Sequence, residues 1–367
     1  MYRLPWLFSA LICGFAFQFV QANADEIISG AVRRTCEIWR ITPENIVLIG
    51  EDSQGQVSIL KKTDRLAFDL GPERPLPVTP NNPNAPKPEP QGRIARVIDK
   101  DEHSMLVRVT SYADGIFSGI DDEEKPWSKA LKDLKLVSLF PVSAPSREMK
   151  IEFVKQLPDY CGEACIQMAT EFLGQPVAQE RVNKLAGLHG QRGVYSNELV
   201  GTLSKLGLEQ TPASSTFFVR DEHLDYGLDL GRVLKALDRH RPVLLGLWAD
   251  PDHKTNEDRW AFDHFVLAVG YDLKRQTLII QDPGGRPGWN LAFEDFITHR
   301  TNKRRMLFSI EFPSSREWNV NGRHFAAEYH GRDGADVILK PDRKPETAVK
   351  YADLSKDDQE FVERAGP

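Results

Sequence analysis

Helical and strand-like apolar patterns follow one another in residues 148–313, and this mixture restricts that part of the chain to an α+β fold. Apolar residues at helical spacing predict three helices, at about 161–173, 197–206 and 230–240. Gly174 and Gly207 are the expected ends of the first two helices. Apolar runs typical of strands follow at 243–248, 264–271 and 276–281. One α+β domain is therefore expected over 148–313.

The segments on either side of this domain have β patterns. Short strands between turn residues are predicted in residues 25–142, at 37–41, 45–49, 56–60, 93–98 and 105–110, with an irregular stretch after them. Eight prolines lie between residues 71 and 92 and predict an extended loop there. We expect 25–142 to form one small β-barrel or sandwich with an accessory role. Residues 314–367 form a third, polar module with a β pattern of its own.

Length and charge limit the classes of partner. A chain of 367 residues suits two or three domains. Its formal net charge is −6, whereas nucleic acid and anionic membranes both require a basic face. We therefore expect neither nucleic acid nor a membrane as a partner of the mature chain.

The N-terminus is typical of a signal peptide. Arg3 supplies the positive charge, and the stretch from Leu4 to Val20 carries none. Small residues at positions 22 and 24 then fit a cleavage site, so we expect residues 1–24 to be removed and the mature chain to begin near Asp25. The alternative is an uncleaved anchor, because this apolar run is close to the shortest that spans a membrane. The cleavage pattern favours an exported, periplasmic or secreted protein.

Cysteine usage points to thiol chemistry. Removal of the signal peptide would leave Cys36, Cys161 and Cys165 of the four cysteines. An exported protein can form disulfides, but three cysteines do not make a disulfide framework. At least one thiol must stay unpaired or bond to another molecule, which suggests that a thiol is kept for chemistry.

Cys161 has the sequence surroundings of a nucleophile. A turn with Pro158 and Asp159 delivers it to the first turn of a helix, where the free N–H groups and the helix dipole stabilise a thiolate. We expect Gly162 to leave room beside the sulfur for a substrate carbonyl. Gln156 is placed to donate its amide N–H to an oxyanion, together with the backbone N–H of Cys161. Alone, this pattern fits a buried core cysteine about as well.

His264 and Asp282 complete the pattern. His264 begins one predicted strand, Asp282 ends the next, and the predicted turn at Asp272 to Lys274 lies midway between them. A hairpin folded about this turn would make the two residues cross-strand neighbours. Cys161 would then attack, His264 would take and return the proton, and Asp282 would orient the imidazole. A cysteine hydrolase acting on amide bonds is the predicted function.

The same residues carry a resemblance to a known family. Gln156-x4-Cys161-Gly-x-Ala-Cys, followed by His264-Phe-Val-x-x-Val-Gly-Tyr-Asp and by Ile280-x-Asp-Pro-x-Gly, resembles the bacteriocin-processing cysteine peptidases and their stand-alone C39-like relatives. The resemblance covers about 148–313. It implies a papain-like fold, a triad of Cys161, His264 and Asp282, Gln156 as oxyanion donor, and a peptide or protein substrate.

The C-terminal module carries a second resemblance. Arg316-Glu-Trp-Asn-Val-Asn-Gly, Val337-Ile-Leu-Lys and Leu354-Ser-Lys-Asp-Asp-Gln-Glu-Phe are similar to the SLA1 homology domain, a small SH3-like β module. The resemblance implies a barrel closed by a short helix, for which Ser355 is a good N-cap. It also implies a possible protein partner. Because the candidate catalytic residues lie outside this module, we expect the domain at 148–313 to fold without it.

Two other functions remain open at this stage. A transglutaminase-like acyl transferase uses the same Cys, His, Asp order, and a non-catalytic adaptor could keep a papain-like scaffold between two β modules. No cofactor or metal is expected. The acidic loop with Asp250, Asp252, His253, Glu257 and Asp258 has no standard ligand spacing and is expected to be solvated.

Overall fold

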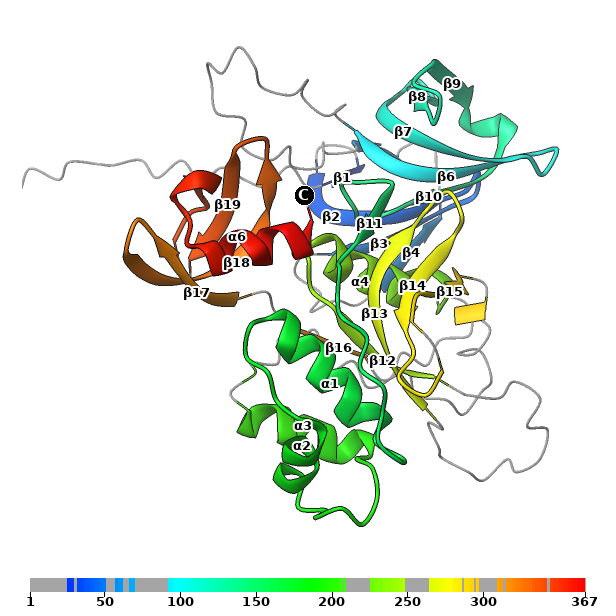
Figure 1. Ribbon diagram of the computed structural model, residues 1–367. Helices are drawn as coiled ribbons and strands as arrows, with labels where there is room; N and C mark the ends of the chain where they lie inside the picture. The colour runs from blue at the N-terminus through cyan, green and yellow to red at the C-terminus, as the bar shows by residue number, and fades with distance from the viewer. Residues whose placement is uncertain are drawn as a thin grey trace, which may run out of the picture.

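The chain forms a mixed α+β structure with three antiparallel sheets (Figure 1). The computed structural model describes residues 25–29, 32–50, 57–61, 66–69, 92–206, 208, 225–247, 264–285, 287–293, 295–296, 309–312, 315–341 and 344–366. The proposed signal peptide, nearly all of the proline-rich loop and the acidic loop at 250–258 lie outside these residues. Within the described part of the chain, no helix is long and apolar enough to cross a membrane.

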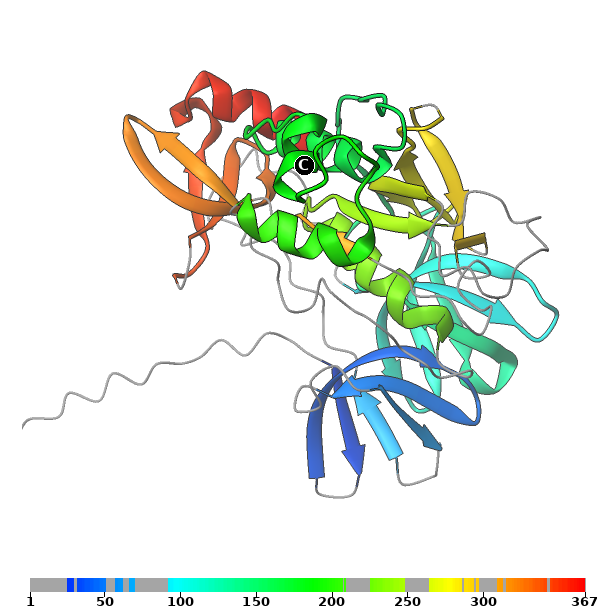
Figure 2. The ribbon, with the colours of Figure 1, turned by 90° about the horizontal axis from the view of Figure 1, so that it is seen from below.

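The N-terminal sheet has ten strands. They are β1 (Asp25–Ser29), β2 (Val32–Ile41), β3 (Asn45–Gly50), β4 (Val57–Lys61), β5 (Leu66–Asp69), β6 (Arg93–Asp99), β7 (Ser104–Ala113), β8 (Ile116–Asp121), β9 (Pro126–Ala130) and β10 (Leu134–Leu139). Figure 2 shows them as two groups, β1–β5 in blue and β6–β9 in cyan to teal. A buried cluster that includes Ile38, Val107, Phe117 and Leu134 forms their core.

The expectation of an irregular stretch after residue 110 is wrong, because β8, β9 and β10 lie there, with a 3-10 turn at Leu131–Asp133 between β9 and β10. In β8 and β9 only Phe117 and Trp127 are buried, so these strands have too few apolar residues for a clear alternating pattern.

The second sheet lies in the α+β domain. Its strands are β11 (Ser146–Glu148), β12 (Val243–Leu247), β13 (His264–Asp272), β14 (Thr277–Gln281), β15 (Trp289–Ala292) and β16 (Ser309–Glu311). Their order is β15-β14-β13-β12-β16, and β11 also pairs with β13. Seven consecutive residues of β13 are buried, because α1 and α4 contact this central strand. A continuous apolar run is what such a position requires.

In the described part of the chain, the helices with full bounds beside this sheet are α1 (Cys161–Phe172), α2 (Gln179–Leu185), α3 (Ser196–Lys205) and α4 (Asp225–Asp238). Figure 1 shows α1, α2 and α3 gathered together beside the sheet. Three of them were expected from the apolar spacing. The short α2 was not, because only Val182 and the polar residues Gln179 and Asn183 are buried in it.

The third sheet lies in the C-terminal module. It has four strands in sequence order, β17 (Ser315–Val320), β18 (Arg323–Asp333), β19 (Asp336–Pro341) and β20 (Thr347–Lys350). A 3-10 turn at Tyr351–Asp353 and helix α6 (Lys356–Ala365) follow. The N-cap expected at Ser355 is confirmed, since its Oγ accepts the backbone N–H of Asp358 at 3.2 Å.

The C-terminal module shares its core with the α+β domain. One buried cluster includes Met168 and Phe172 of α1 as well as Trp318, Tyr329 and Phe361 of the module. The rings of Phe172 and Phe361 are 5.2 Å apart. At the same junction, Arg241 forms an ion pair with Glu328 at 2.5 Å. The main apolar cluster of the N-terminal sheet is separate.

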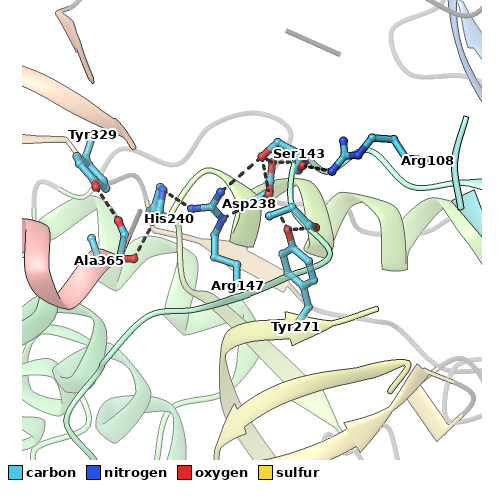
Figure 3. A network of polar contacts seen from close by, with 10 residues as sticks. Arg108, Ser143, Arg147, Asp238, His240, Tyr271, Tyr329 and Ala365 are labelled. Carbon is cyan, nitrogen blue, oxygen red and sulfur yellow. Dashed lines mark hydrogen bonds and ion pairs between the residues drawn. The ribbon is translucent and has the colours of Figure 1, made fainter. Parts of the chain in front are cut away.

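A polar network joins all three parts (Figure 3). Arg108 of β7 donates to the Ser143 carbonyl at 3.2 Å, and the Ser143 N–H donates to Asp238 of α4 at 2.9 Å. Arg147 of β11 lies between Asp238 and His240, and His240 Nδ1 lies 2.9 Å from the Ala365 carbonyl of α6. The relative placement of the three parts is therefore fixed by directed contacts as well as by apolar packing.

Candidate active site

Cys161 is the first residue of α1, and a tight turn sets its position. The Tyr160 N–H donates to the Leu157 carbonyl at 3.0 Å and closes a four-residue turn. Pro158 is second in this turn, and Asp159 is third with a φ of 64°. These are the features of a type II turn, in which proline fixes the second residue and the third needs a left-handed backbone. The side chain of Cys161 is half-buried at the point where the helix begins.

Gly162 has a packing role and not the one expected from the sequence. A Cβ atom at this position would lie 3.0 Å from Val194 and 3.3 Å from Phe265. Gly162 is buried and therefore faces the core, where its missing side chain lets α1 approach β13. Successive residues of a helix point in directions about 100° apart, so the residue after Cys161 need not lie beside its sulfur.

The hairpin that carries His264 and Asp282 differs in register from the expected one. Its turn occupies 273–276. Strand β13 has a bulge between Ala268 and Gly270, and the last pair of the β13–β14 ladder is Leu267 opposite Gln281. His264 and Asp282 are thus diagonal and not direct neighbours. Because this shift is by two residues, both side chains stay on the same face of the sheet. Long side chains still meet across such a diagonal.

His264 contacts both other members of the predicted triad. Its Nε2 lies 2.5 Å from Asp282 Oδ1. The ring also hydrogen-bonds the Cys161 side chain, and since Nε2 faces the carboxylate, Nδ1 is the nitrogen left for the sulfur. Burial alone lowers the pKa of His264, but the hydrogen bonds with Asp282 and Cys161 outweigh burial and raise it from 6.5 to about 9. The imidazole therefore favours its protonated form.

Asp282 is held by the backbone that follows it. Its Oδ1 accepts the N–H groups of Gly284 at 3.0 Å and Gly285 at 3.2 Å, in addition to its contact with His264. Burial raises the pKa of Asp282, but the hydrogen bond and charge of His264 and these two N–H groups lower it overall. The carboxylate is charged and fixed in orientation.

Gln156 lies beside the imidazole. Its backbone N–H donates to the Pro283 carbonyl at 3.0 Å, which ties it to the residue after Asp282. Its Oε1 is buried and has no hydrogen-bond partner among the described residues. A Cβ atom on Gly284 would lie 3.1 Å from this oxygen and 3.0 Å from His264 Cε1. Glycine at 284 is therefore needed for the close approach of Gln156 and His264.

The other two cysteines of the described chain are buried. Cys165 lies one turn after Cys161 inside the core, and burial raises its pKa well above the ordinary value. A thiol in this state is unreactive, as expected from the sequence. Cys36 lies in the core of the N-terminal sheet.

Several residues that support the site were not singled out from the sequence. Gln179, the first residue of α2, accepts the Leu157 N–H at 2.8 Å and donates to the Lys155 carbonyl at 3.0 Å, so it clamps the backbone on both sides of Gln156. Glu163 is a buried acid on the first turn of α1. The available signal was a charged residue inside the otherwise apolar run after Cys161.

A thiol beside an imidazole that a carboxylate orients is the arrangement found in cysteine hydrolases. Residues 148–299 match the family model of the Peptidase_C39 like family, so this part of the chain is a Peptidase_C39-like domain. The match implies a papain-like fold and indicates a cysteine peptidase.

Two curated proteins are similar over a shorter stretch. They are the argininosuccinate synthases of Desulfitobacterium hafniense strains DCB-2 and Y51, each 29% identical over 140 residues, or 35% of this chain. The chain spans about a third of the length of these relatives, 33% and 32% respectively.

Proposed function

We propose that the chain is an exported cysteine peptidase in which Cys161 is the nucleophile, His264 the proton carrier and Asp282 the group that orients the imidazole. The observation that carries this proposal is the position of His264, which hydrogen-bonds Cys161 through one side of the ring and Asp282 through the other. This contact requires a helix and two strands to meet, and a structural histidine would not need both partners.

The chemistry follows from these contacts. The Cys161 thiolate adds to the amide carbonyl carbon, and the carbonyl oxygen takes the negative charge. As the tetrahedral intermediate collapses, protonated His264 gives its proton to the leaving nitrogen, the C–N bond breaks and a thioester remains. Water then attacks the thioester while His264 takes its proton, and the C–S bond breaks to restore the thiolate and release the acid.

Gln156 is our proposed oxyanion donor. Its backbone is fixed next to Asp282, and its Oε1 is buried with no hydrogen-bond partner among the described residues. An amide in this state can aim its NH2 at a developing oxyanion without breaking an existing bond. Replacing Gln156 by alanine is expected to lower kcat by about a hundredfold, as removal of one such donor does in other hydrolases.

The first test is labelling with an electrophilic peptide probe, followed by peptide mapping. We expect the label on Cys161. Cys161→Ala should neither label nor cleave peptide, whereas Cys165→Ser should keep substantial activity. Asp282→Asn should lower kcat by about tenfold or more with a smaller effect on KM. If Cys165→Ser is inactive while Cys161→Ala is active, the assignment of the nucleophile is wrong.

The same assay separates the two other functions. An acyl transferase supplied with a peptide and an amine would give a stable amide in place of a hydrolysed end. A non-catalytic adaptor would leave Cys161 unmodified by a thiol alkylator near neutral pH. Hydrolysis with a labelled Cys161 contradicts both.

Export and the three-part domain division, 25–142, 148–313 and 314–367, are further parts of the proposal. Asp25, the first residue after the proposed cleavage site, is buried in an ion pair with Arg93 and accepts the Ile38 N–H at 2.6 Å. A folded mature chain can therefore begin there. N-terminal sequencing of the exported protein should give Asp25; retention of residues 1–24 would contradict cleavage.

The resemblance of 314–367 to the SLA1 homology domain, with its SH3-like barrel, suggests that this module presents a protein substrate or partner. The β17–β18 hairpin offers Glu317, Arg323 and His324 as exposed residues. Reversing charge at Arg323 should reduce cleavage of a large protein substrate and leave a short peptide unaffected. Equal effects on both substrates would remove support for this role.

A further inference from the structure

Glu163 is a fully buried acid on the first turn of the helix that carries Cys161. It has 0% exposed surface, although it lies only two residues after the half-buried cysteine. Residues two apart lie on nearly opposite sides of a helix. Glu163 therefore points away from the sulfur, and into the rest of the helical part of the domain.

Its contacts bind a segment that has no regular structure. Glu163 Oε1 accepts the side-chain amide of Asn183 at 2.8 Å and the backbone N–H of Val194 at 3.1 Å. Asn183, which is 1% exposed, also donates to the Arg192 carbonyl at 2.7 Å and accepts the Gly190 N–H at 2.7 Å. Two buried side chains thus satisfy three backbone groups of the 190–194 segment. Such groups need partners because an unpaired buried N–H or carbonyl is costly.

This segment lies directly against the turn and helix end that carry the nucleophile. A Cβ atom on Gly193 would lie 1.8 Å from the Asp159 carbonyl oxygen, so the two backbones touch. Val194 contacts the position where a Gly162 side chain would stand. Tyr195 follows at once and is 58% exposed. A shift of 193–194 would therefore displace the residues on both sides of Cys161.

The surroundings of the Glu163 carboxyl also affect its pKa. Glu163 Oε2 is buried and has no hydrogen-bond partner among the described residues. Burial raises the pKa of Glu163, although the hydrogen bonds from Asn183 and Val194 oppose this effect. The groups around it are Tyr160, Cys165, Arg192 and Glu198. Oε1 is therefore the carboxyl oxygen that holds Asn183 and Val194.

We infer that Glu163 is a positioning residue for the peptidase proposed above: with Asn183 it holds the 190–194 segment against the turn before Cys161 and so fixes the sulfur relative to His264. The inference rests on the proposed function for its kinetic consequence. The hydrogen bonds that Asn183 and Glu163 accept from the Gly190 and Val194 amides do not depend on the proposed function.

The test compares three variants by steady-state kinetics, thermal unfolding and hydrogen exchange. Glu163→Leu keeps the size and removes both oxygens, whereas Glu163→Gln keeps the acceptor and mimics the neutral acid. Thr170→Val is the control, because Thr170 is 1% exposed and hydrogen-bonded on the same helix, two turns further from the sulfur. We expect Glu163→Leu to lower kcat about ten- to hundredfold, with a smaller change in KM and faster exchange at Gly190 and Val194. Glu163→Gln should stay within about threefold of wild type.

The outcomes separate the possibilities. Thr170→Val should lose stability without loss of kcat; if Glu163→Leu behaves in the same way, Glu163 is merely structural. If Glu163→Gln is as impaired as Glu163→Leu, the inference is also wrong, because the acceptor alone would not suffice. Should Glu163→Leu fail to fold, Asn183→Ala, which removes the amide donor and acceptor without adding a charge, must show a partial loss of kcat. If wild type cleaves no peptide, the proposed function fails, and exchange at Gly190 and Val194 in Glu163→Leu and Glu163→Gln still decides the clamp.

Discussion

The protonation of His264 depends on two neighbours whose effect is opposite to that of burial. Burial favours the neutral ring, while Asp282 and Cys161 favour the imidazolium and raise the pKa to about 9. Because this pKa lies above the ordinary value of 6.5, the stabilisation from the charged ring is fully present below about pH 6.5 and is lost as pH rises through about 9. Over the same pH range, His264 loses the proton that it must give to the leaving group.

Peptide turnover should therefore fall on the alkaline side as pH passes about 9, where His264 loses its proton. Asp282→Asn removes the first of the two groups that raise this pKa, so its alkaline limb should move to lower pH. Measurement of kcat/KM against pH for both proteins tests this. An alkaline limb that does not move in Asp282→Asn would show that Asp282 does not set the protonation of His264.

Gly284 is a second residue on which the site depends. Gly284→Ala should lower kcat by about tenfold while the protein stays folded, because the new methyl would crowd His264 and Gln156. Gly201→Ala on α3 is the matched control, since a Cβ atom there meets nothing within 4 Å. The control should be as active as wild type and more stable by about 0.5–1 kcal/mol. Equal activity of the two variants would mean that the Gly284 contact has no catalytic consequence.

Among the local elements, the turn at 157–160 links backbone conformation directly to the nucleophile. Pro158 suits its second position, but Asp159 occupies a left-handed conformation that costs most side chains free energy. Aspartate and asparagine tolerate this conformation better than bulky residues do. The turn therefore stores little strain with the natural residue.

Asp159→Gly should leave the free energy of unfolding unchanged or slightly raised, whereas Asp159→Val should lower it by about 1–2 kcal/mol. The valine variant should also cleave peptide more slowly, because the turn delivers Cys161 to the helix. Denaturant unfolding and peptide assays on both variants are the measurement. A valine variant as stable as the glycine variant would contradict the assigned turn type.

In the whole molecule, the shared core alters the expectation that 148–313 folds without the C-terminal module. Phe361 packs against Phe172 of α1, and α6 returns to the start of the domain, where the Lys150 N–H donates to the Arg364 carbonyl at 2.8 Å. Removal of the module would leave the Phe172 face of α1 in water. This face lies on the same helix as Cys161.

Truncation after Pro313 should therefore yield an unstable or insoluble chain, and in the full chain Phe361→Ala should lower the free energy of unfolding by about 3–5 kcal/mol. Removal of Pro367 alone is the control and should have little effect. Circular dichroism and thermal unfolding are the measurements. A truncated chain that is folded and labels at Cys161 would show that the core of 148–313 is sufficient.

His240 makes the junction of Figure 3 sensitive to acid. Arg147 can only donate, so His240 Nε2 accepts its hydrogen bond at 2.8 Å, and His240 Nδ1 donates to the Ala365 carbonyl. Burial, and after it the positive charge of Arg147, lowers the pKa of His240 well below 6.5. The folded state thus binds fewer protons than the unfolded state below that pH. The contribution of His240 to stability should therefore fall as pH drops below about 6.5. Denaturant unfolding from pH 8 to 5 tests this, and His240→Asn, which cannot titrate, should show a shallower decline.

The amino-acid sequence by itself determined the features that depend on neighbours in the chain. The start of α1 at Cys161, the buried strand after His264 and the N-cap at Ser355 follow from turn chemistry, apolar spacing and capping, all of which act within a few residues. The tertiary structure decided the rest. The bulge in β13, the buried state of Glu163 and the contact of Phe172 with Phe361 each require residues far apart in the chain to meet. Local sequence patterns do not predict these contacts, because the free energy that stabilises the contacts comes from packing and strand pairing in the folded state.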